Sequence, residues 1–229
     1  MFDKQIEIEI IAIYKFFAKE CPYLFNHSIV AGGAIRDSLL GVEVKDIDIF
    51  VPWGIKTGSK DLGNNGVNGL VSPFLNRYTE QNYDLDYEET GFTVYNVQDT
   101  VLRSMGVTHP VQIIFKNNVD EKFDIVKDFP ISLSRVYFDP VENKIVRSKA
   151  YSKSVTTGIV LYNPSSCPEE YLERMRAKHP NFKFYRNGPI DTYTVAYGAS
   201  SVNPRPSIKT KTAWTSLHFE KPRTGSKAL

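Results

Sequence analysis

The stretch VAGGAIRDSLLGVEVKDIDIFV, from Val30 to Val51, decides how this chain folds. It opens with two adjacent glycines and closes on two acids that alternate with isoleucines. Gly41, a residue type that often ends helices, predicts where the helix after the glycines stops, and Pro52 is expected to end the following strand. The pattern predicts four elements in order: a buried strand (28–31), a turn (32–33), a helix (34–40) and a second strand (45–51).

The second strand carries two carboxylates, Asp46 and Asp48, separated by one apolar residue. Residues two positions apart on a strand project from the same face, roughly 6.5–7 Å apart along the backbone. Two carboxylates held at that distance repel each other, and a divalent cation relieves the repulsion. Because oxygen ligands of this kind suit Mg²⁺, with Mn²⁺ as an alternative, the pair predicts a metal site. Ile47 and Ile49 are then expected to face the core.

The glycine turn supplies a complementary feature. A turn without Cβ atoms lets a phosphate approach the backbone closely, and the N-terminus of a helix offers unpaired N–H groups to an anion. The segment is therefore expected to hold a triphosphate at Gly32 and Gly33 and metal ions at its other end. Two ions about 3.5–4 Å apart would stabilise both the attacking and the leaving oxygens of an in-line displacement.

The residues of this segment also resemble a known family. The string GGAIRDSLLG, from Gly32 to Gly41, followed after four residues by Asp46-Ile47-Asp48, resembles the head-domain signature of bacterial poly(A) polymerases and tRNA CCA-adding enzymes. That family belongs to the polymerase-β-like nucleotidyltransferase superfamily. A second segment, KDFPISL from Lys127 with YFDP ending at Pro140, is similar to a degenerate form of the family's RRDFTINAL…YDP motif. The resemblance covers about residues 1–150.

The resemblance implies an α+β nucleotidyltransferase fold, in which helices flank a small mixed β-sheet and a short αβ extension follows. It implies that an acceptor hydroxyl attacks the α-phosphate of a nucleoside triphosphate, such as ATP, and that pyrophosphate leaves. Arg36 is then expected near the triphosphate, Asp37 would buttress the turn, and Asp128 would lie near the ribose or base. The implied site combines two metal-binding catalytic acids with six nucleotide-binding residues: Asp46 and Asp48, then Gly32, Gly33, Arg36, Asp37, Lys45 and Asp128.

The chain departs from the family at the third carboxylate, which the superfamily usually places on a later strand. The strand predicted over 111–116 carries Gln112 there, an amide without charge. Asp124, with apolar neighbours on both sides, is the alternative catalytic acid, although it equally fits a surface position. The basic pair expected before Asp128 is also reduced to a single lysine, Lys127. These departures leave open a non-enzymatic alternative, a nucleotide-binding or structural module.

The nature of the acceptor rests on the same resemblance. CCA-adding enzymes carry helical neck, body and tail domains that grip tRNA, and this chain is too short for them, so CCA addition is not expected. We expect a minimal nucleotidyltransferase that acts on an RNA 3′ end, with a protein or small-molecule hydroxyl as the alternative. Arg174 and Lys178 share one face of a predicted helix; that face is either solvated or, with Lys183 and Arg186, grips acceptor phosphates.

Composition places further bounds on the chain. Lys and Arg exceed Asp and Glu by 28 to 26 among 229 residues, so net charge alone points to no polyanionic partner. The two cysteines, Cys21 and Cys167, lie far apart and form no zinc motif. The N-terminus lacks the pattern of a signal peptide and no apolar run is long enough to span a membrane, so we expect a cytoplasmic protein without a membrane partner. No feature indicates an oligomeric state.

The remaining chain is predicted as three regions: a nucleotidyltransferase domain (1–150), a helix–strand extension packed on it (151–190), and a basic tail rich in Ser, Thr and Pro (191–229). The tail is either solvated or a strap on nucleic acid, in which Trp214 would stack on a base. A helix is predicted over 3–20, although its IEIEI alternation also fits a strand. Further predicted elements are a Gly- and Asn-rich loop (53–68), helices (73–82, 99–105, 168–178), strands (91–98, 111–116, 181–186), a short ordered segment (122–128), a strand or helix (131–138) and a turn at Asp139.

Overall fold

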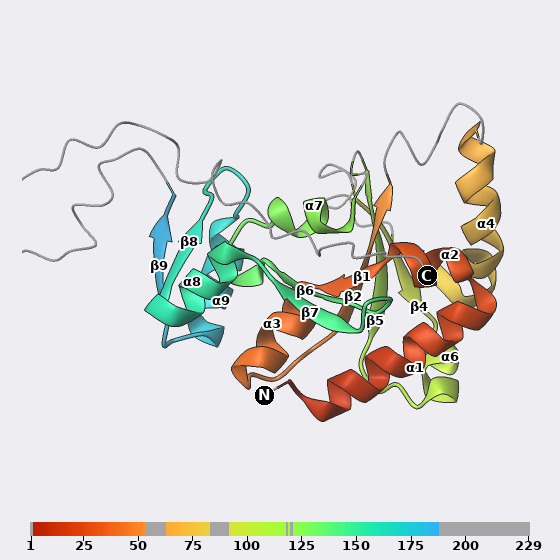
Figure 1. The fold of residues 1–229 in the computed structure, drawn as a ribbon, viewed down its shortest axis with the longest axis horizontal. Helices are drawn as coiled ribbons and strands as arrows, with labels where there is room; N and C mark the ends of the chain where they lie inside the picture. Colours follow the sequence, from red (N-terminus) through yellow and green to blue (C-terminus); the bar gives the residue numbers. More distant parts are fainter. Residues whose placement is uncertain (1, 54–62, 83–91, 118, 120, 188–229) are drawn as a thin grey trace, which may run out of the picture. The chain divides into compact units, whose positions relative to one another are not determined.

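A computed structural model describes residues 2–53, 63–82, 92–117, 119 and 121–187 (Figure 1). The chain divides into two compact units: the first comprises Met1–Phe129 and Ser134–Val146, and the second comprises Pro130–Leu133 and Arg147–Leu229. The predicted division at residue 150 did not anticipate that a short inner segment belongs with the second unit. The predicted tail and most of the predicted Gly/Asn-rich loop lie outside the described residues.

The described strands of the first unit form one seven-stranded sheet in the order β3-β4-β5-β2-β1-β6-β7. The central strand β2 pairs antiparallel with β1 and parallel with β5, so the sheet is mixed. Together with the flanking helices this confirms the predicted α+β class. The strands are β1 (Ile29–Ala31), β2 (Ile47–Trp53), β3 (Thr79–Asn82), β4 (Phe92–Val97), β5 (Val111–Asn117), β6 (Val136–Asp139) and β7 (Lys144–Arg147).

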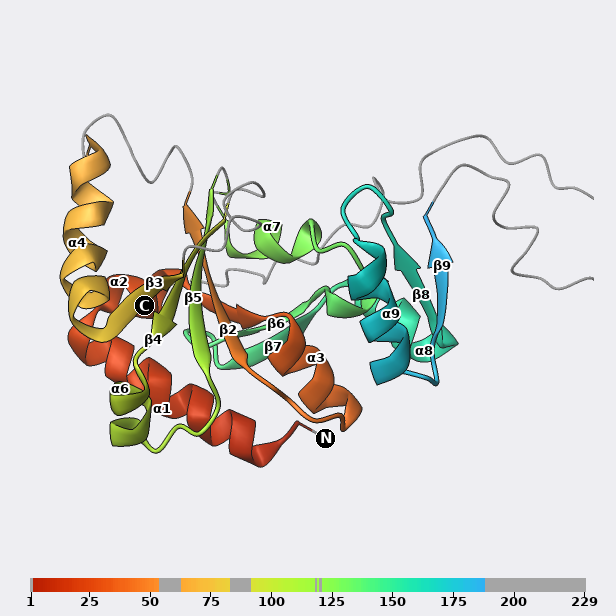
Figure 2. The same ribbon diagram turned by 180° about the vertical axis from the view of Figure 1, so that it is seen from behind.

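Six described helices accompany this sheet. They are α1 (Lys4–Glu20), α2 (Pro22–His27), α3 (Gly33–Leu40), α4 (Gly63–Tyr78), α6 (Asp99–Met105) and α7 (Lys122–Lys127). Figure 2 shows α3 on one side of β2, with β5 and β4 on the other. The side chains of Ile47, Ile49 and Ile113 are fully buried, as the alternating pattern predicts. Among the described residues, no helix is long and apolar enough to cross a membrane.

Helix α1 shows why its sequence forms a helix rather than a strand. The Asp3 carboxylate accepts hydrogen bonds from the backbone N–H groups of Gln5 and Ile6, which caps the first turn. The apolar residues repeat at helical spacing and are buried against the fold: Ile6, Ile10, Ile13, Tyr14 and Phe17. The strand alternative is therefore wrong, because the 3.6-residue period continues well beyond the short IEIEI alternation.

The described part of the second unit pairs two short parallel strands with two helices. Ser132 ties the inner segment to this unit, because its hydroxyl lies 2.7 Å from the Ser154 hydroxyl and accepts a 2.9 Å hydrogen bond from the Leu161 N–H. Only the second helix and second strand were predicted. The elements are α8 (Lys149–Thr157), β8 (Ile159–Tyr162), α9 (Glu169–Lys178) and β9 (Lys183–Arg186), and the 3-10 turn η1 (Ser132–Ser134) lies at the start of this region.

The predicted end of the second strand is wrong. Pro52 does not end β2, which continues to Trp53. Pairing with β1 stops at Phe50. Beyond that residue, β5 is the one partner of β2 among the described strands, and a proline is tolerated there.

Helix α4 corrects the predicted loop (53–68) and helix (73–82). It begins at Gly63 and ends at Tyr78, and the next four residues form β3. Its apolar residues Val71, Phe74 and Leu75 are buried, so packing outweighs the poor helix propensity of its glycines and Pro73. Unpredicted elements are α2, β7, α8 and β8, and the segment predicted as strand or helix over 131–138 contains η1 and then β6.

Glu9 is the one acid on the buried face of α1, and it has no exposed surface. Its carboxylate accepts hydrogen bonds from Thr108 (2.7 Å) and Gln5 (2.8 Å) and lies 2.8 Å from the His109 Nδ1. Burial alone would raise the pKa of Glu9, but these hydrogen bonds outweigh burial and lower the pKa to about 2. The carboxylate therefore joins α1 to the segment that leads into β5.

We expect Glu9→Gln to reduce the free energy of unfolding by about 2–3 kcal/mol at pH 7, because charge-assisted hydrogen bonds are lost. A lowered pKa gives stability that is present above pH 4.5 and is lost as the pH falls toward 2, so the difference from wild type should shrink over that range. Urea unfolding at several pH values measures both effects. Glu7→Gln, an exposed acid on the same helix, is the control and should change little. Equal losses from both substitutions would contradict this account.

Candidate active site

The turn between β1 and α3 has a backbone that only glycine adopts readily. Gly32 has φ 73° and ψ −134°, outside the regions open to other residues. A Cβ atom on Gly32 would lie 3.3 Å from Asp48 Oδ2, and one on Gly33 would lie 3.8 Å from Asp46 Oδ1. The two carboxylates therefore lie directly against the two glycines. A side chain at Gly32 would both strain the turn and crowd Asp48.

Arg36 and Asp37 form a clasp behind this turn. The guanidinium donates two hydrogen bonds to the carboxylate, from Nε to Oδ1 at 2.6 Å and from Nη2 to Oδ2 at 2.9 Å, and a third to Ser134 Oγ at 2.9 Å. Both side chains are almost fully buried. The predicted buttress role suits Asp37, whereas Arg36 is engaged by the protein and contributes a fixed positive charge close to Gly33. Bidentate geometry of this kind fixes the orientation of both groups.

The surroundings of Asp48 raise the pKa of its carboxyl group. Burial raises the pKa of Asp48, the neighbouring charge of Asp46 raises it further, and the positive charge of Arg36 opposes them; the pKa is raised to about 7. Near neutral pH, the protein alone only partly stabilises the ionised pair. A bound cation would supply the missing positive charge.

The strand beside the acidic pair carries an amide. Gln112 on β5 lies in register with Asp48, so both side chains are on one face of the sheet. Its Nε2 donates a 3.1 Å hydrogen bond to Oδ1 of Asn96 on β4. Asn96 was missed by the sequence reasoning, although its place in the alternating FTVYNV strand is a signal that predicts the face on which it lies.

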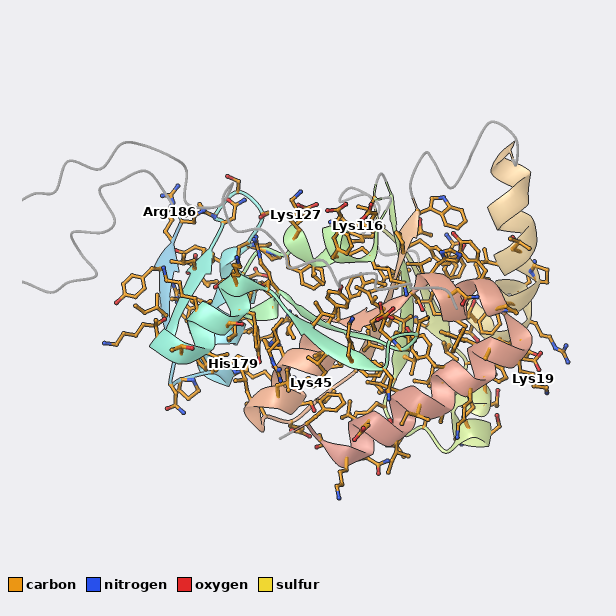
Figure 3. The ribbon with its side chains drawn as sticks, viewed as in Figure 1. Lys19, Lys45, Lys116, Lys127, His179 and Arg186 are labelled. Atoms are coloured by element: carbon orange, nitrogen blue, oxygen red, sulfur yellow. The ribbon has the colours of Figure 1, made fainter. Side chains whose placement is uncertain are left out.

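Two further predicted acids pair with lysines. Asp124 lies on α7, 3.8 Å from Lys127 Nζ, and Asp128 accepts a 3.2 Å hydrogen bond from Lys116. Among the described residues, no group of three or more His, Cys, Asp or Glu side chains could hold a metal ion. Lys45 is exposed near α3, at the other end of the sheet from Lys116 and Lys127 (Figure 3).

The face predicted on α9 is formed in the second unit. Arg174 lies with its guanidinium carbon 5.3 Å from the centre of the Tyr171 ring, a cation–π contact on the same helix. Lys183 and Arg186 are the first and last residues of β9. A phosphate grip by these residues stays a prediction.

Comparison with known proteins places the chain in a family. Residues 8–158 match the family model described as "Gad2: Gabija anti-defense 2 family protein". The chain belongs to this family. The match includes the glycine turn, both aspartates and Gln112, so the geometry described above lies within the Gad2 region.

More distant relatives include tRNA-processing enzymes. A protein named "Multifunctional CCA protein", from Aliivibrio salmonicida, is 36% identical to the Gad2 chain over 80 residues, 32% of this chain and 20% of that protein. A Thermotoga maritima CCA-adding enzyme, solved in complex with tRNA, is 14% identical, with 77% of this chain and 39% of the enzyme covered and a TM-score of 0.48. A tRNA-processing enzyme in an apo form is 18% identical, with 81% and 45% covered and a TM-score of 0.45.

The chain spans less than half the length of these relatives. The observed architecture, a mixed sheet with flanking helices, is of the α+β class that the sequence predicts. Any chemistry must be argued from the residues of the site.

Asp48→Asn should stabilise the folded protein at pH 8 by about 1–3 kcal/mol, because asparagine cannot carry the unfavourable charge. A carboxyl group whose pKa is raised from 3.8 to about 7 loses folded-state stability as the pH rises through that interval. The gain should therefore vanish below pH 4. Urea unfolding without divalent cations measures it. Asp99→Asn, which changes an exposed acid on α6, is the matched control. A stability difference between Asp48→Asn and wild type that does not depend on pH would refute the electrostatic explanation.

Proposed function

We propose that this protein is a metal-dependent nucleotidyltransferase, which transfers a nucleoside monophosphate from a nucleoside triphosphate to an acceptor hydroxyl and releases pyrophosphate. The observation that carries the proposal is the contact of Asp46 and Asp48 with a glycine turn that opens a helix. Two half-buried carboxylates that repel each other are a poor arrangement unless a cation joins them. A turn without side chains, followed by unpaired N–H groups, is a place where phosphates bind.

The residues present fit Mg²⁺ or Mn²⁺. Asp46 and Asp48 would supply carboxylate oxygens, while water and triphosphate oxygens complete a shell of hard ligands. When bound, the metal ions neutralise charge on the α-phosphate and on the leaving pyrophosphate. The backbone N–H groups of Gly33 and of the rest of the first turn of α3 would orient the phosphates. Arg36, fixed by Asp37, adds positive charge behind them without moving.

The resemblance to CCA-adding enzymes makes an RNA 3′ end the first acceptor to test, and a protein or small-molecule hydroxyl is the alternative. The family description adds a setting, since its members are named for counteracting the Gabija defence. We infer that nucleotidyl transfer is the means by which this chain does so. In that case Asp46→Asn should abolish the ability of this protein to counteract the Gabija defence in cells that carry it, while the abundance of the protein stays normal.

A second candidate function is nucleotide binding without transfer. Gln112 favours this alternative. It stands where the third carboxylate is expected, and its uncharged amide leaves the metal site with less negative charge than three carboxylates would give. The cost of keeping two like charges together argues against it. The two candidates differ in one observable, the release of pyrophosphate.

Asp46→Asn and Asp48→Asn should each lower nucleotidyl transfer at least about 100-fold, because each removes charge needed to stabilise the transition state. Incubation with Mg²⁺, each α-³²P-labelled NTP, an RNA pool and protein acceptors shows where the label goes, and pyrophosphate release measures turnover. Asp99→Asn is the control and should keep full activity. Near-normal turnover in either active-site variant would show that the metal assignment is wrong.

Mg²⁺ with a non-hydrolysable NTP should raise the melting temperature of the wild-type protein. Saturation at about 100 times Kd adds about 2.7 kcal/mol to the free energy of unfolding. The increase should be much smaller in Asp48→Asn, because a neutral amide binds the cation less tightly. Thermal unfolding with and without EDTA measures this difference. An identical shift in both proteins would place the nucleotide elsewhere.

A further inference from the structure

A row of four side chains crosses the sheet of the first unit from the candidate active site to its edge. Asp48 on β2 is in register with Gln112 on β5, Gln112 with Asn96 on β4, and Asn96 with Glu80 on β3. Residues in register on paired strands project from the same face of a sheet. We call these four residues the polar row. With neighbouring strands about 4.8 Å apart, the row extends about 14 Å from Asp48.

The polar row and the glycine turn lie on opposite sides of Asp48. The turn follows β1, where Ala31 is in register with Asp48 on the side away from Gln112. Figure 2 shows the same arrangement, with α3 on one side of β2 and β5 and β4 on the other. In an in-line displacement the attacking oxygen approaches opposite the leaving group. Because the proposed triphosphate site is the glycine turn, the acceptor hydroxyl must approach over Gln112 and Asn96.

The two amides suit a hydroxyl group. An amide offers both a donor and an acceptor, and the 3.1 Å hydrogen bond between Gln112 and Asn96 holds both side chains in place. Gln112 is half-buried, whereas Asn96 and Glu80 are exposed and accessible to a large acceptor. Gln112 accepts no proton, so the proton of the hydroxyl would pass to solvent.

The charge of the polar row bears on the rest of the acceptor. Its charged members are both acidic, Asp48 at one end and Glu80 at the other. Lys116 is the one cation on the described parts of β2 to β5, and it lies four residues beyond Gln112, bound to Asp128 at 3.2 Å. Beyond the proposed metal site, a phosphate next to the reacting hydroxyl, as at an RNA 3′ end, would therefore meet Glu80 and, on the described parts of these strands, no cation except Lys116, which Asp128 engages. A positive charge next to the hydroxyl would instead pair with Glu80.

We propose that the polar row is the acceptor site and that it selects a hydroxyl side chain in a protein segment with a neighbouring Lys or Arg. The inference rests on the proposed function. The hydroxyl oxygen forms a bond to the α-phosphorus of the NTP, the bond from that phosphorus to the oxygen bridging to the β-phosphate breaks, and pyrophosphate leaves with the electron pair. The product is a nucleoside monophosphate joined to the side chain through a phosphodiester.

Peptide pools test this acceptor site with the full-length protein, Mg²⁺ and α-³²P-labelled NTP. One pool has a single Ser, Thr or Tyr flanked by Lys, a second has Glu in place of Lys, and an RNA pool carries free 3′ hydroxyls. We expect label on the Lys-flanked pool at least 10 times faster than on either other pool. Equal or faster labelling of RNA would overturn the inference while leaving nucleotidyl transfer intact. No pyrophosphate release with any acceptor would overturn the proposed function, and the inference with it.

Charge reversal within β3 gives the matched comparison. Glu80→Lys should raise KM for the Lys-flanked pool about tenfold, lower KM for the Glu-flanked pool and leave KM for the NTP unchanged. Gln81→Lys adds a lysine at the adjacent position, where pairing with Tyr95 places the side chain on the opposite face of the sheet. This substitution should leave all three KM values unchanged. Gln112→Ala should raise KM for the acceptor more than for the NTP. Equal effects of the two lysine substitutions would show that Glu80 does not select the acceptor.

Discussion

The repulsion between Asp46 and Asp48 is the constraint on which the rest of this structure depends. Both acids lie at the glycine turn, one next to Gly32 and the other next to Gly33. Burial and, to a lesser extent, the charge of Asp46 raise the pKa of Asp48 to about 7. Keeping both carboxylates ionised therefore costs free energy in the folded protein. Natural proteins tolerate such local destabilisation mainly where function requires it. A cation bound between the two carboxylates, as proposed, would relieve this destabilisation.

The surrounding fold keeps this arrangement rigid. β2 is held on both sides, by β1 and by β5, and the buried side chains of Ile47 and Ile49, which alternate with the acids, anchor it in the core. The Arg36–Asp37 clasp fixes the first turn of α3, and breaking one partner of a buried ion pair costs about 3–5 kcal/mol. Rigidity matters here because preorganised charges need not rearrange as a reaction proceeds.

The central part of this site was predictable from the sequence, because it is local. Glycine pair, helix, helix-ending glycine and alternating acids fall within 22 residues, and short-range rules cover all of them. The role of Arg36 was less predictable, since only the fold shows that Asp37 and Ser134 engage its guanidinium. Asp124 shows the limit of pattern reasoning: its apolar neighbours fit a strand as well as the helix α7 that it occupies.

Long-range pairing accounts for what the sequence did not reveal. Asn96 and Glu80 line up with Asp48 only through the register of β2 to β5, which no local pattern specifies. The first turns of helix α4, residues 63–68, were mistaken for a loop because glycines and asparagines dominate that segment. The same long-range register separates the two halves of the proposed reaction. Phosphates would bind where the chain itself forms a turn, whereas the acceptor would bind where separate strands meet. The acceptor side can therefore differ between proteins that share the glycine turn and the acidic pair, because its side chains come from strands outside that segment.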